Sequence, residues 1–249
     1  MKRAAPRPPA MRLDVFLQRE FSLRSRTYAE NLILRGLVEV DGRVVKKPSF
    51  DVPEDCKTAR ILQDDNYASQ GAYKLAEALR AFSIDISGAD CADIGCSNGG
   101  FTDLMLRRGA KSVLAVDVGE CALPESILAD SRVTFLKANA RELPPTKDKD
   151  FLSADLSFIS LTLVLPAFFD VLKEGGKAVL LVKPQFEAGR SALSKKGIVL
   201  SEKERAKAVE KVSSAAKCAG FKVLGSTPSP VMYEDKNREY LLLLEKPRS

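Results

Sequence analysis

The 249-residue sequence contains no histidine. This absence excludes metal sites built on imidazole ligands, Ser-His-Asp triads and histidine general bases. Acid–base chemistry in this chain must therefore use lysine, carboxylate, tyrosine or cysteine side chains. We predict no metal site.

Paired cysteines and long apolar runs are also missing. The five cysteines are scattered and form no CxxC pair, which is typical of reduced thiols in the cytoplasm. No apolar run reaches the roughly 18 residues that a membrane span requires. The basic, proline-rich start of the chain lacks the apolar core of a signal peptide. We therefore expect a cytoplasmic protein without a membrane segment.

Positive charge is concentrated at the start of the chain. Residues 1–50 hold 11 Lys/Arg and 5 Asp/Glu, whereas residues 51–249 hold 28 of each. A basic segment on a neutral body indicates binding to a polyanion, and nucleic acid is favoured over a membrane because no long apolar stretch accompanies the charge. A solvated basic tail is the alternative.

The chain is long enough for one large domain and one small one. We predict a disordered basic tail over 1–10 and a polar linker over 58–70. Between them, apolar spacing predicts helices near 12–17 and over 25–35. Alternating apolar residues around an Asp-Gly turn predict a hairpin over 38–45.

From residue 71 onward, strands and helices alternate, which predicts an α/β fold with a doubly wound, mostly parallel sheet. A helix from 72 to 82 precedes the first strand. Two strands joined without a helix, 221–224 and 239–244, predict an antiparallel edge hairpin at the C-terminal end. The other predicted strands are 91–94, 113–117, 133–136, 151–155 and 178–182, and the helices are 99–108, 122–129, 160–172 and 202–219.

A glycine-rich turn follows the first of these strands. Gly95 begins the pattern Gly-x-Ser-x-Gly-Gly, and Asp117 ends the next strand 22 residues later. Such a turn lets the backbone approach a ligand, and the acid can accept hydrogen bonds from ribose hydroxyls. The pair indicates a nucleoside-cofactor site, with an ordinary tight turn and a surface aspartate as the alternative. The pattern lacks the Gly-x-Gly-x-x-Gly of dinucleotide enzymes, which favours S-adenosylmethionine over NAD.

Polar residues follow several other predicted strands. Asn139, Asp155 and Lys183 each lie where a strand ends. Because ligands of open α/β sheets bind beyond the carboxyl ends of the strands, we expect these residues to meet Gly95 and Asp117 on one rim. Asp155 and Lys183 are consistent with a simple ion pair or with a catalytic site, and spacing alone leaves both interpretations open.

The N-terminal segments Arg12–Leu17, Ser25-Arg26, Ile33–Gly42 and Lys47-Pro48 resemble an S4 domain, a small RNA-binding module. The resemblance covers 11–57. In such modules, basic residues on the two helices face RNA phosphates and supply affinity rather than sequence reading. The resemblance implies four candidate RNA contacts: Arg12, Arg24, Arg26 and Arg35.

The rest of the chain resembles the TlyA family of S4-linked, FtsJ-like ribosomal RNA 2′-O-methyltransferases. The segments that carry this resemblance are Gly71–Leu75, Asp93–Asp103, Ala115–Gly119, Asp155–Leu161, Leu181–Arg190, Thr227–Pro230 and Asn237–Tyr240. The resemblance implies a Rossmann-like methyltransferase domain over 71–249 that uses S-adenosyl-L-methionine and acts on ribosomal subunits, with cytidine as the acceptor. The implied cofactor-binding residues are Gly95, Cys96, Ser97, Asn98, Gly99, Gly100, Phe101, Asp117, Val118, Asn139, Ala140 and Asp155.

The same resemblance implies a catalytic tetrad of Lys74, Asp155, Lys183 and Glu239. A ribose hydroxyl is a poor nucleophile that must be aligned with the methyl group and lose its proton. We assign Lys183 as the proton acceptor. Because a free lysine has a pKa near 10.4, a lysine base needs a second cation, here Lys74, and desolvation on RNA docking to outweigh the stabilisation of its charged form by Asp155. A charged Lys183 that only orients the hydroxyl is the alternative.

The chain departs from the family pattern before the first tetrad lysine, where the usual Ser-Arg-Gly-Gly is Ser69-Gln70-Gly71-Ala72. One cation is lost there, which implies a different affinity or target choice. Two other function classes compete with the enzyme. One is a non-catalytic RNA-binding or ribosome-assembly protein, and the other is a haemolysin, an activity associated with related sequences. The oligomeric state is left open.

Overall fold

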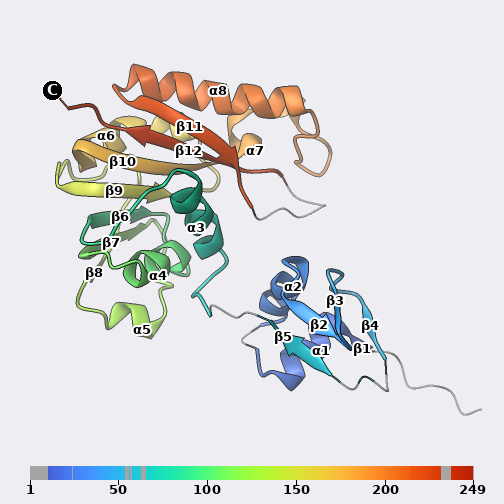
Figure 1. Ribbon diagram of the computed structural model, residues 1–249. Coiled ribbons are helices and arrows are strands. Elements are labelled where there is room, and N and C mark those ends of the chain that lie inside the picture. The colour runs from blue at the N-terminus through green and yellow to red at the C-terminus, as the bar shows by residue number, and fades with distance from the viewer. Residues whose placement is uncertain are drawn as a thin grey trace, which may run out of the picture. The chain divides into compact units, whose positions relative to one another are not determined.

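The computed structural model describes residues 11–23, 25–53, 56, 58–62, 66–230 and 237–248, so the predicted tail over 1–10 lies outside the described residues. The chain divides into two compact units, Met1–Asn66 and Tyr67–Ser249. Figure 1 shows the helices and strands of each unit.

The N-terminal unit packs two helices against short antiparallel strands. Ser25 caps the second helix by accepting a hydrogen bond from the Tyr28 N–H, as serine does at helix N-termini. The predicted hairpin forms, and its turn residues Asp41 and Gly42 have φ of 46° and 78°. The elements are β1 (Met11–Arg12), α1 (Leu13–Glu20), α2 (Arg26–Leu34), β2 (Val38–Val40), β3 (Arg43–Val44), β4 (Asp51–Val52) and β5 (Ala59–Ile61).

Strand β5 lies inside the stretch that the sequence predicts to be a linker. Its residues pair with β2 in antiparallel register and complete a three-stranded sheet of order β3-β2-β5, beside the separate pair of β1 and β4. The pattern Ala-Arg-Ile is too short to be distinguished from a polar connection by periodicity. Pairing with β2 supplies the backbone partners that make it a strand.

A buried carboxylate joins the two helices of the N-terminal unit. The Asp14 side chain is fully buried and lies 2.8 Å from the nearest guanidinium nitrogen of both Arg12 and Arg26. It also accepts a hydrogen bond from the Val15 N–H. Burial acts to raise the pKa of Asp14, but these hydrogen bonds outweigh it and hold the pKa below its ordinary value.

We expect Asp14→Asn to destabilise the N-terminal unit by about 2 kcal/mol at neutral pH, since the variant loses charge-assisted hydrogen bonds. Because the folded-state pKa lies below the unfolded value, this stabilisation is present above the ordinary value of 3.8 and is lost as the pH falls through the folded-state pKa. Urea unfolding followed at NMR signals of α1 and α2 measures the difference. A gap between wild type and variant that widens in acid would contradict this origin.

The second unit contains a seven-stranded sheet of order β11-β12-β10-β9-β6-β7-β8. Strands β6 to β10 are mutually parallel, whereas β12 is antiparallel to both of its neighbours. The predicted antiparallel hairpin at the edge is therefore confirmed. The strands are β6 (Asp90–Ile94), β7 (Ser112–Asp117), β8 (Val133–Lys137), β9 (Lys149–Ala154), β10 (Leu172–Val182), β11 (Lys222–Pro228) and β12 (Tyr240–Glu245).

Helices cover both faces of this sheet (Figure 1). Successive strand residues point to opposite faces, and both sets are apolar. One core contains Cys91, Phe151 and Val179 with α3, α4 and α5, and the other contains their neighbours in sequence with α6 and α8. The helices are α3 (Gly71–Ala81), α4 (Gly100–Arg107), α5 (Glu125–Leu128), α6 (Leu165–Val171), α7 (Pro184–Glu187) and α8 (Glu202–Cys218), with short 3₁₀ turns at Leu161–Leu163 and Arg190–Ala192.

Proline explains two differences from the predicted helices. The helix predicted over 122–129 contains only α5, which begins directly after Pro124, because a proline keeps the residue before it out of the helical region. The helix predicted over 160–172 is divided into a 3₁₀ turn and α6, which has Pro166 in its first turn.

No helix in the described part of the chain is long and apolar enough to cross a membrane.

Candidate active site

Four charged side chains converge at the carboxyl edge of the central sheet. Asp155 follows β9 and Lys183 follows β10, so both lie where parallel strands end. Glu239 immediately precedes β12, whose Tyr240 pairs with Val182 at the end of β10. The antiparallel direction of β12 thus brings the start of this strand to the edge where β10 ends. Lys74 lies in the first turn of α3, which packs against α4.

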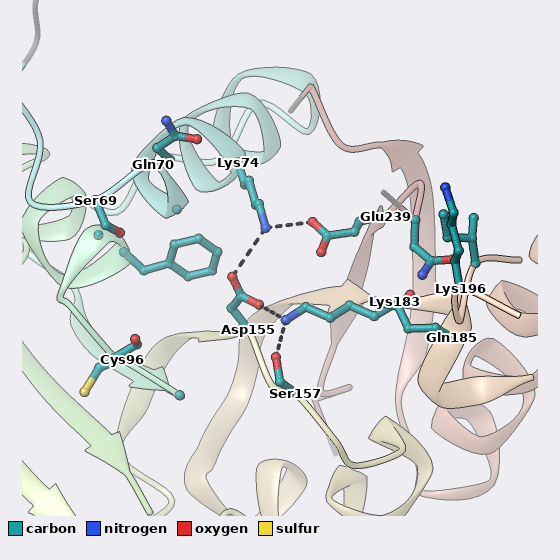
Figure 2. A pocket seen from close by; sticks show the side chains of 17 residues that line it. Ser69, Gln70, Lys74, Cys96, Asp155, Ser157, Lys183, Gln185, Lys196 and Glu239 are labelled. Carbon is teal, nitrogen blue, oxygen red and sulfur yellow. Dashed lines mark hydrogen bonds and ion pairs between the residues drawn. The ribbon is translucent and has the colours of Figure 1, made fainter. Parts of the chain in front are cut away.

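These four side chains form a chain of alternating charges (Figure 2). The Lys74 Nζ atom lies 2.7 Å from Glu239 Oε2 and 3.6 Å from Asp155 Oδ2. The other oxygen of Asp155 lies 2.6 Å from Lys183 Nζ. Between 11% and 22% of each side chain is exposed, so water screens these charges much less than surface pairs. The structure therefore brings together all four residues of the predicted tetrad.

Lys183 has a further partner that sequence reasoning missed. Its Nζ donates a hydrogen bond of 2.8 Å to Ser157 Oγ. Ser157 lies two residues after Asp155 in one of the segments that carry the family resemblance, and this proximity was the available signal. A lysine ammonium has three donor hydrogens. Asp155 and Ser157 together fix the direction in which Lys183 points.

A buried glutamate holds the segments that carry Ser157 and Lys183 against each other. Glu187 closes the short helix α7, which starts directly after Lys183. Its carboxylate accepts hydrogen bonds from the Leu161 N–H at 2.7 Å and from Ser160 Oγ at 2.5 Å. The loop that follows β9 is thereby anchored to the helix that follows β10.

The glycine turn lies directly beside this cluster. Gly95 has a φ of +84°, and a Cβ atom at this position would lie 2.7 Å from the backbone oxygen of Asp155. Any side chain here would strain the backbone and push β9 away. Gly99 has a φ of +78° and is the N-cap of α4. The turn therefore packs tightly against the backbone of Asp155 and leads directly into the N-terminus of α4.

Asp117 fastens the glycine turn to the end of β7. One carboxylate oxygen accepts the Ser97 N–H at 2.9 Å, and the other accepts the Gly119 N–H at the same distance. Each carboxylate oxygen has a second lone pair. Asp117 can therefore keep both contacts and still accept hydrogen bonds from a ligand.

Asp93, in β6, is a polar residue in the sheet core that the sequence analysis assigned no role. It is fully buried and accepts hydrogen bonds from Thr102 Oγ1 at 2.7 Å and Ser153 Oγ at 3.2 Å. Burial raises the pKa of Asp93 to about 7, against the opposing effect of these two hydroxyls. The side chain connects α4 to β6 and β9 and so stabilises the base of the glycine turn.

Two cavities meet at this edge of the sheet, and both have residues Gly95, Ser97, Asp155 and Ser157 in their walls. The first has a volume of about 550 Å³ and contains the charged cluster. The second has a volume of about 380 Å³ and a largely apolar wall, to which Asp117 and Asn139 add polar groups that the first cavity lacks. Both volumes lie in the range of small-molecule sites.

Most of the predicted cofactor-binding residues line one of these cavities. Cys96, Gly100 and Phe101 line the first, and Asp117, Val118, Asn139 and Ala140 line the second, while Gly95, Ser97 and Asp155 line both. Asn98 and Gly99 line neither. A Cβ atom on Gly99 would meet Leu123 and Ile127, so this residue faces the protein interior.

The four predicted RNA contacts belong to the N-terminal unit. Arg12 and Arg26 pair with Asp14 and leave 44% and 48% of their side chains exposed. Arg35 is exposed at the end of α2. Arg24 lies outside the described residues. The two arginines paired with Asp14 are thereby held in defined orientations while part of each side chain stays accessible.

Each of the two units matches the model of a known protein family. Residues 67–246 match the model of the FtsJ-like methyltransferase family. Residues 11–55 match the model of the S4 domain.

Several characterised proteins are similar over nearly the whole chain. A 16S/23S rRNA (cytidine-2′-O)-methyltransferase TlyA from Mycobacterium tuberculosis is 41% identical, with 94% of this chain and 89% of that protein covered. Hemolysin A from Brachyspira hyodysenteriae is 36% identical, with 93% and 98% covered. A 23S rRNA (cytidine-2′-O)-methyltransferase TlyA from Campylobacter jejuni is 30% identical, with 92% and 97% covered.

Several solved structures are also similar to this chain. A candidate hemolysin from Streptococcus thermophilus superimposes with a TM-score of 0.73 at 37% identity, covering 97% of this chain and 90% of that one. An S-adenosylmethionine-dependent methyltransferase from Mesorhizobium loti, 19% identical with a TM-score of 0.52 and covering 68% of this chain and 96% of that one, shares the fold alone. The chain belongs to the FtsJ-like methyltransferase family and, within it, to the TlyA group that carries an N-terminal S4 domain.

Proposed function

We propose that this protein transfers a methyl group from S-adenosylmethionine to the 2′-hydroxyl of a cytidine in ribosomal RNA. The observation that supports this proposal best is the cluster of Lys74, Asp155, Lys183 and Glu239 beside the glycine turn. A reaction at a ribose hydroxyl needs such polar groups next to the methyl donor, because the hydroxyl must be aligned and deprotonated.

The two cavities fit the two parts of the cofactor. The apolar wall of the second cavity suits an adenine ring, and Asp117 offers carboxylate oxygens to the ribose hydroxyls. The N–H groups at the start of α4 suit the carboxylate of the methionine part. When bound, S-adenosylmethionine supplies a methyl group on a positively charged sulfur. Gly95, Ser97, Asp117 and Asn139 are the residues that we propose to hold it.

Lys183 is the group that we propose to receive the proton of the 2′-hydroxyl. Asp155 and Ser157 hold its Nζ at 2.6 and 2.8 Å, so the amine can present its remaining position to the acceptor oxygen. In this role a neutral Lys183 would take the hydroxyl proton and become an ammonium ion beside Asp155. The 2′-oxygen would form its bond to the methyl carbon as the bond from that carbon to the cofactor sulfur breaks, which leaves a neutral thioether. A charged Lys183 that only orients the hydroxyl is the alternative.

Lys74 and Glu239 support this arrangement from the other side. Lys74 lies between two carboxylates, at 2.7 Å from Glu239 and 3.6 Å from Asp155. Its positive charge stabilises Asp155 as an anion in a partly buried position. Glu239 offsets the charge of Lys74. We propose that this pair positions Asp155, which in turn positions Lys183.

The S4 unit is proposed to supply affinity for the ribosomal RNA. Arg12, Arg26 and Arg35 present basic groups on or beside its helices, and Arg24 is a fourth candidate. Contacts from such residues to phosphates fix orientation without reading sequence. A protein that modifies ribosomal subunits acts where ribosomes assemble, so we propose that it works in the cytoplasm.

Incubation with labelled S-adenosylmethionine and ribosomal subunits that lack 2′-O-methylation tests the proposal. We expect label to enter the RNA of at least one subunit. Binding to the subunits without incorporation would overturn the enzymatic proposal and favour a non-catalytic assembly protein.

A further inference from the structure

A third lysine lines the cavity that contains the charged cluster. Lys196 is exposed and contributes to the wall of this cavity. Lys74 and Lys183 each lie against a carboxylate. Lys196 differs from them, because among the residues that the structure describes it has no ion-pair partner. The ammonium group of Lys196 is therefore available to bind an anion at this wall of the cavity.

The loop that carries Lys196 has a defined shape. Ser194 accepts the Gly197 N–H at 2.9 Å, which closes a four-residue turn with Lys195 and Lys196 at its centre. Gly197 has a φ of +72°, and the Ser194 N–H donates to the Ile198 oxygen at 2.9 Å. A lysine on such a turn has a fixed backbone position, so less conformational freedom is lost when it binds a ligand.

Asn237 ties this loop to the segment that carries Glu239. Its Oδ1 accepts the Val199 N–H at 2.8 Å, and its Nδ2 donates to the Gly197 oxygen at 2.9 Å. Asn237 lies two residues before Glu239 and lines the same cavity. The position of Lys196 is therefore set by the segment that completes the catalytic cluster.

The place of Lys196 in the cavity distinguishes two possible anions. In Figure 2, Lys196 lies on the side of Gln185 and Glu239, away from Ser69 and Cys96 near the glycine turn. The cofactor carboxylate is expected at that turn. An anion beside Lys196 therefore belongs to the acceptor, and the anionic groups of RNA are its phosphates. Lysine is well suited to a phosphate because it acts as a compact point charge.

We infer that Lys196 binds a backbone phosphate near the acceptor ribose and thereby contributes to the affinity for the RNA. This inference rests on the proposed function and adds an RNA-binding residue in the methyltransferase unit. Because the contact is to the backbone, it contributes to RNA affinity for any acceptor base.

The test compares Lys196→Gln with Lys195→Gln, a matched change on the same turn at an exposed lysine that does not line the cavity. Methyl transfer to ribosomal subunits is measured over a range of salt concentrations, together with the Kd for S-adenosylmethionine. For Lys196→Gln we expect KM for the subunits to rise roughly fivefold to tenfold, with kcat changed less than about twofold. The slope of log affinity against log salt should fall by about 0.7 to 0.9. Lys195→Gln should stay close to wild type.

Three results would overturn the inference. These are an unchanged KM and salt slope in Lys196→Gln, an equal loss in Lys195→Gln, or a weaker Kd for the cofactor, which would place Lys196 at the cofactor instead. If the unaltered protein transfers no methyl group to any subunit, the proposed function fails as well. Transfer by wild type with an unchanged Lys196→Gln variant removes this inference alone.

Discussion

Lys183→Ala should lower kcat for methyl transfer by about 10²- to 10⁴-fold, the usual contribution of a positioned acid–base group. The lysine lies 2.6 Å from Asp155 and 2.8 Å from Ser157 at the carboxyl edge of the sheet, and in the alanine variant no nitrogen remains to take or orient the hydroxyl proton. Single-turnover methylation of ribosomal subunits at saturating cofactor measures this loss. The Kd for S-adenosylmethionine should change little, because the apolar wall and Asp117 are untouched.

Lys183→Arg separates the two possible roles of this residue. Arginine keeps the positive charge but has no accessible neutral form near neutral pH. If Lys183 receives the proton, the arginine variant should be nearly as slow as the alanine variant. Turnover close to wild type in Lys183→Arg would eliminate the proton-acceptor role and support a charged group that only orients the hydroxyl.

Asp155→Asn should lower kcat by at least about 100-fold, since it removes the carboxylate that both lysines contact. Lys74 keeps Glu239, but among the described residues Lys183 keeps only Ser157 as a partner. Breaking a largely buried ion pair by removing one partner is also destabilising, here by up to about 3 kcal/mol. Methylation kinetics and urea unfolding of the full chain measure the two effects.

Glu239→Gln is the matched control for this change. It removes a carboxylate of the same cluster but leaves both contacts of Asp155 in place. We expect a smaller loss of kcat than in Asp155→Asn. The reverse order of the two variants would contradict the view that Asp155 is the residue that positions Lys183.

The sheet could be predicted from the sequence because its strands are apolar and regularly spaced. The parallel strands from β6 to β10 and the hairpin of β11 and β12 were predicted from this pattern. The early start of β10 at Leu172 was not, because residues 173–176 include two glycines and the register shifts before Lys177. Sheet pairing rather than local sequence makes this segment a strand.

The position of the site could be predicted from strand ends, but not all of its contacts. Asp155 and Lys183 end neighbouring parallel strands, so spacing alone brought them to one rim. Lys74 and Glu239 were assigned to the site by the family resemblance. Spacing could not place Glu239, because the pairing of β12 with β10 determines which edge of the sheet the start of β12 reaches. Ser157 and Lys196 had no periodic signal, because loop geometry determines where such side chains point.

In the N-terminal unit, too, the sequence did not predict the contacts between polar side chains. Arg12 and Arg26 were implied as RNA contacts by the resemblance to an S4 domain. Their pairing with Asp14 was not predicted, because it depends on a carboxylate that the folding of α1 against α2 buries. Periodicity shows which face of a helix is apolar, but not which polar group is enclosed beneath it.

We propose that the methyl group goes to a ribose 2′-oxygen. Mapping the labelled position in ribosomal RNA after treatment with the wild-type protein or with Lys183→Ala tests this directly. A 2′-O-methyl group blocks alkaline cleavage of the adjacent phosphodiester bond, so we expect one or a few alkali-resistant sites at cytidines with wild type and none with the variant. Label on a base, in RNA that alkali cleaves completely, would contradict it.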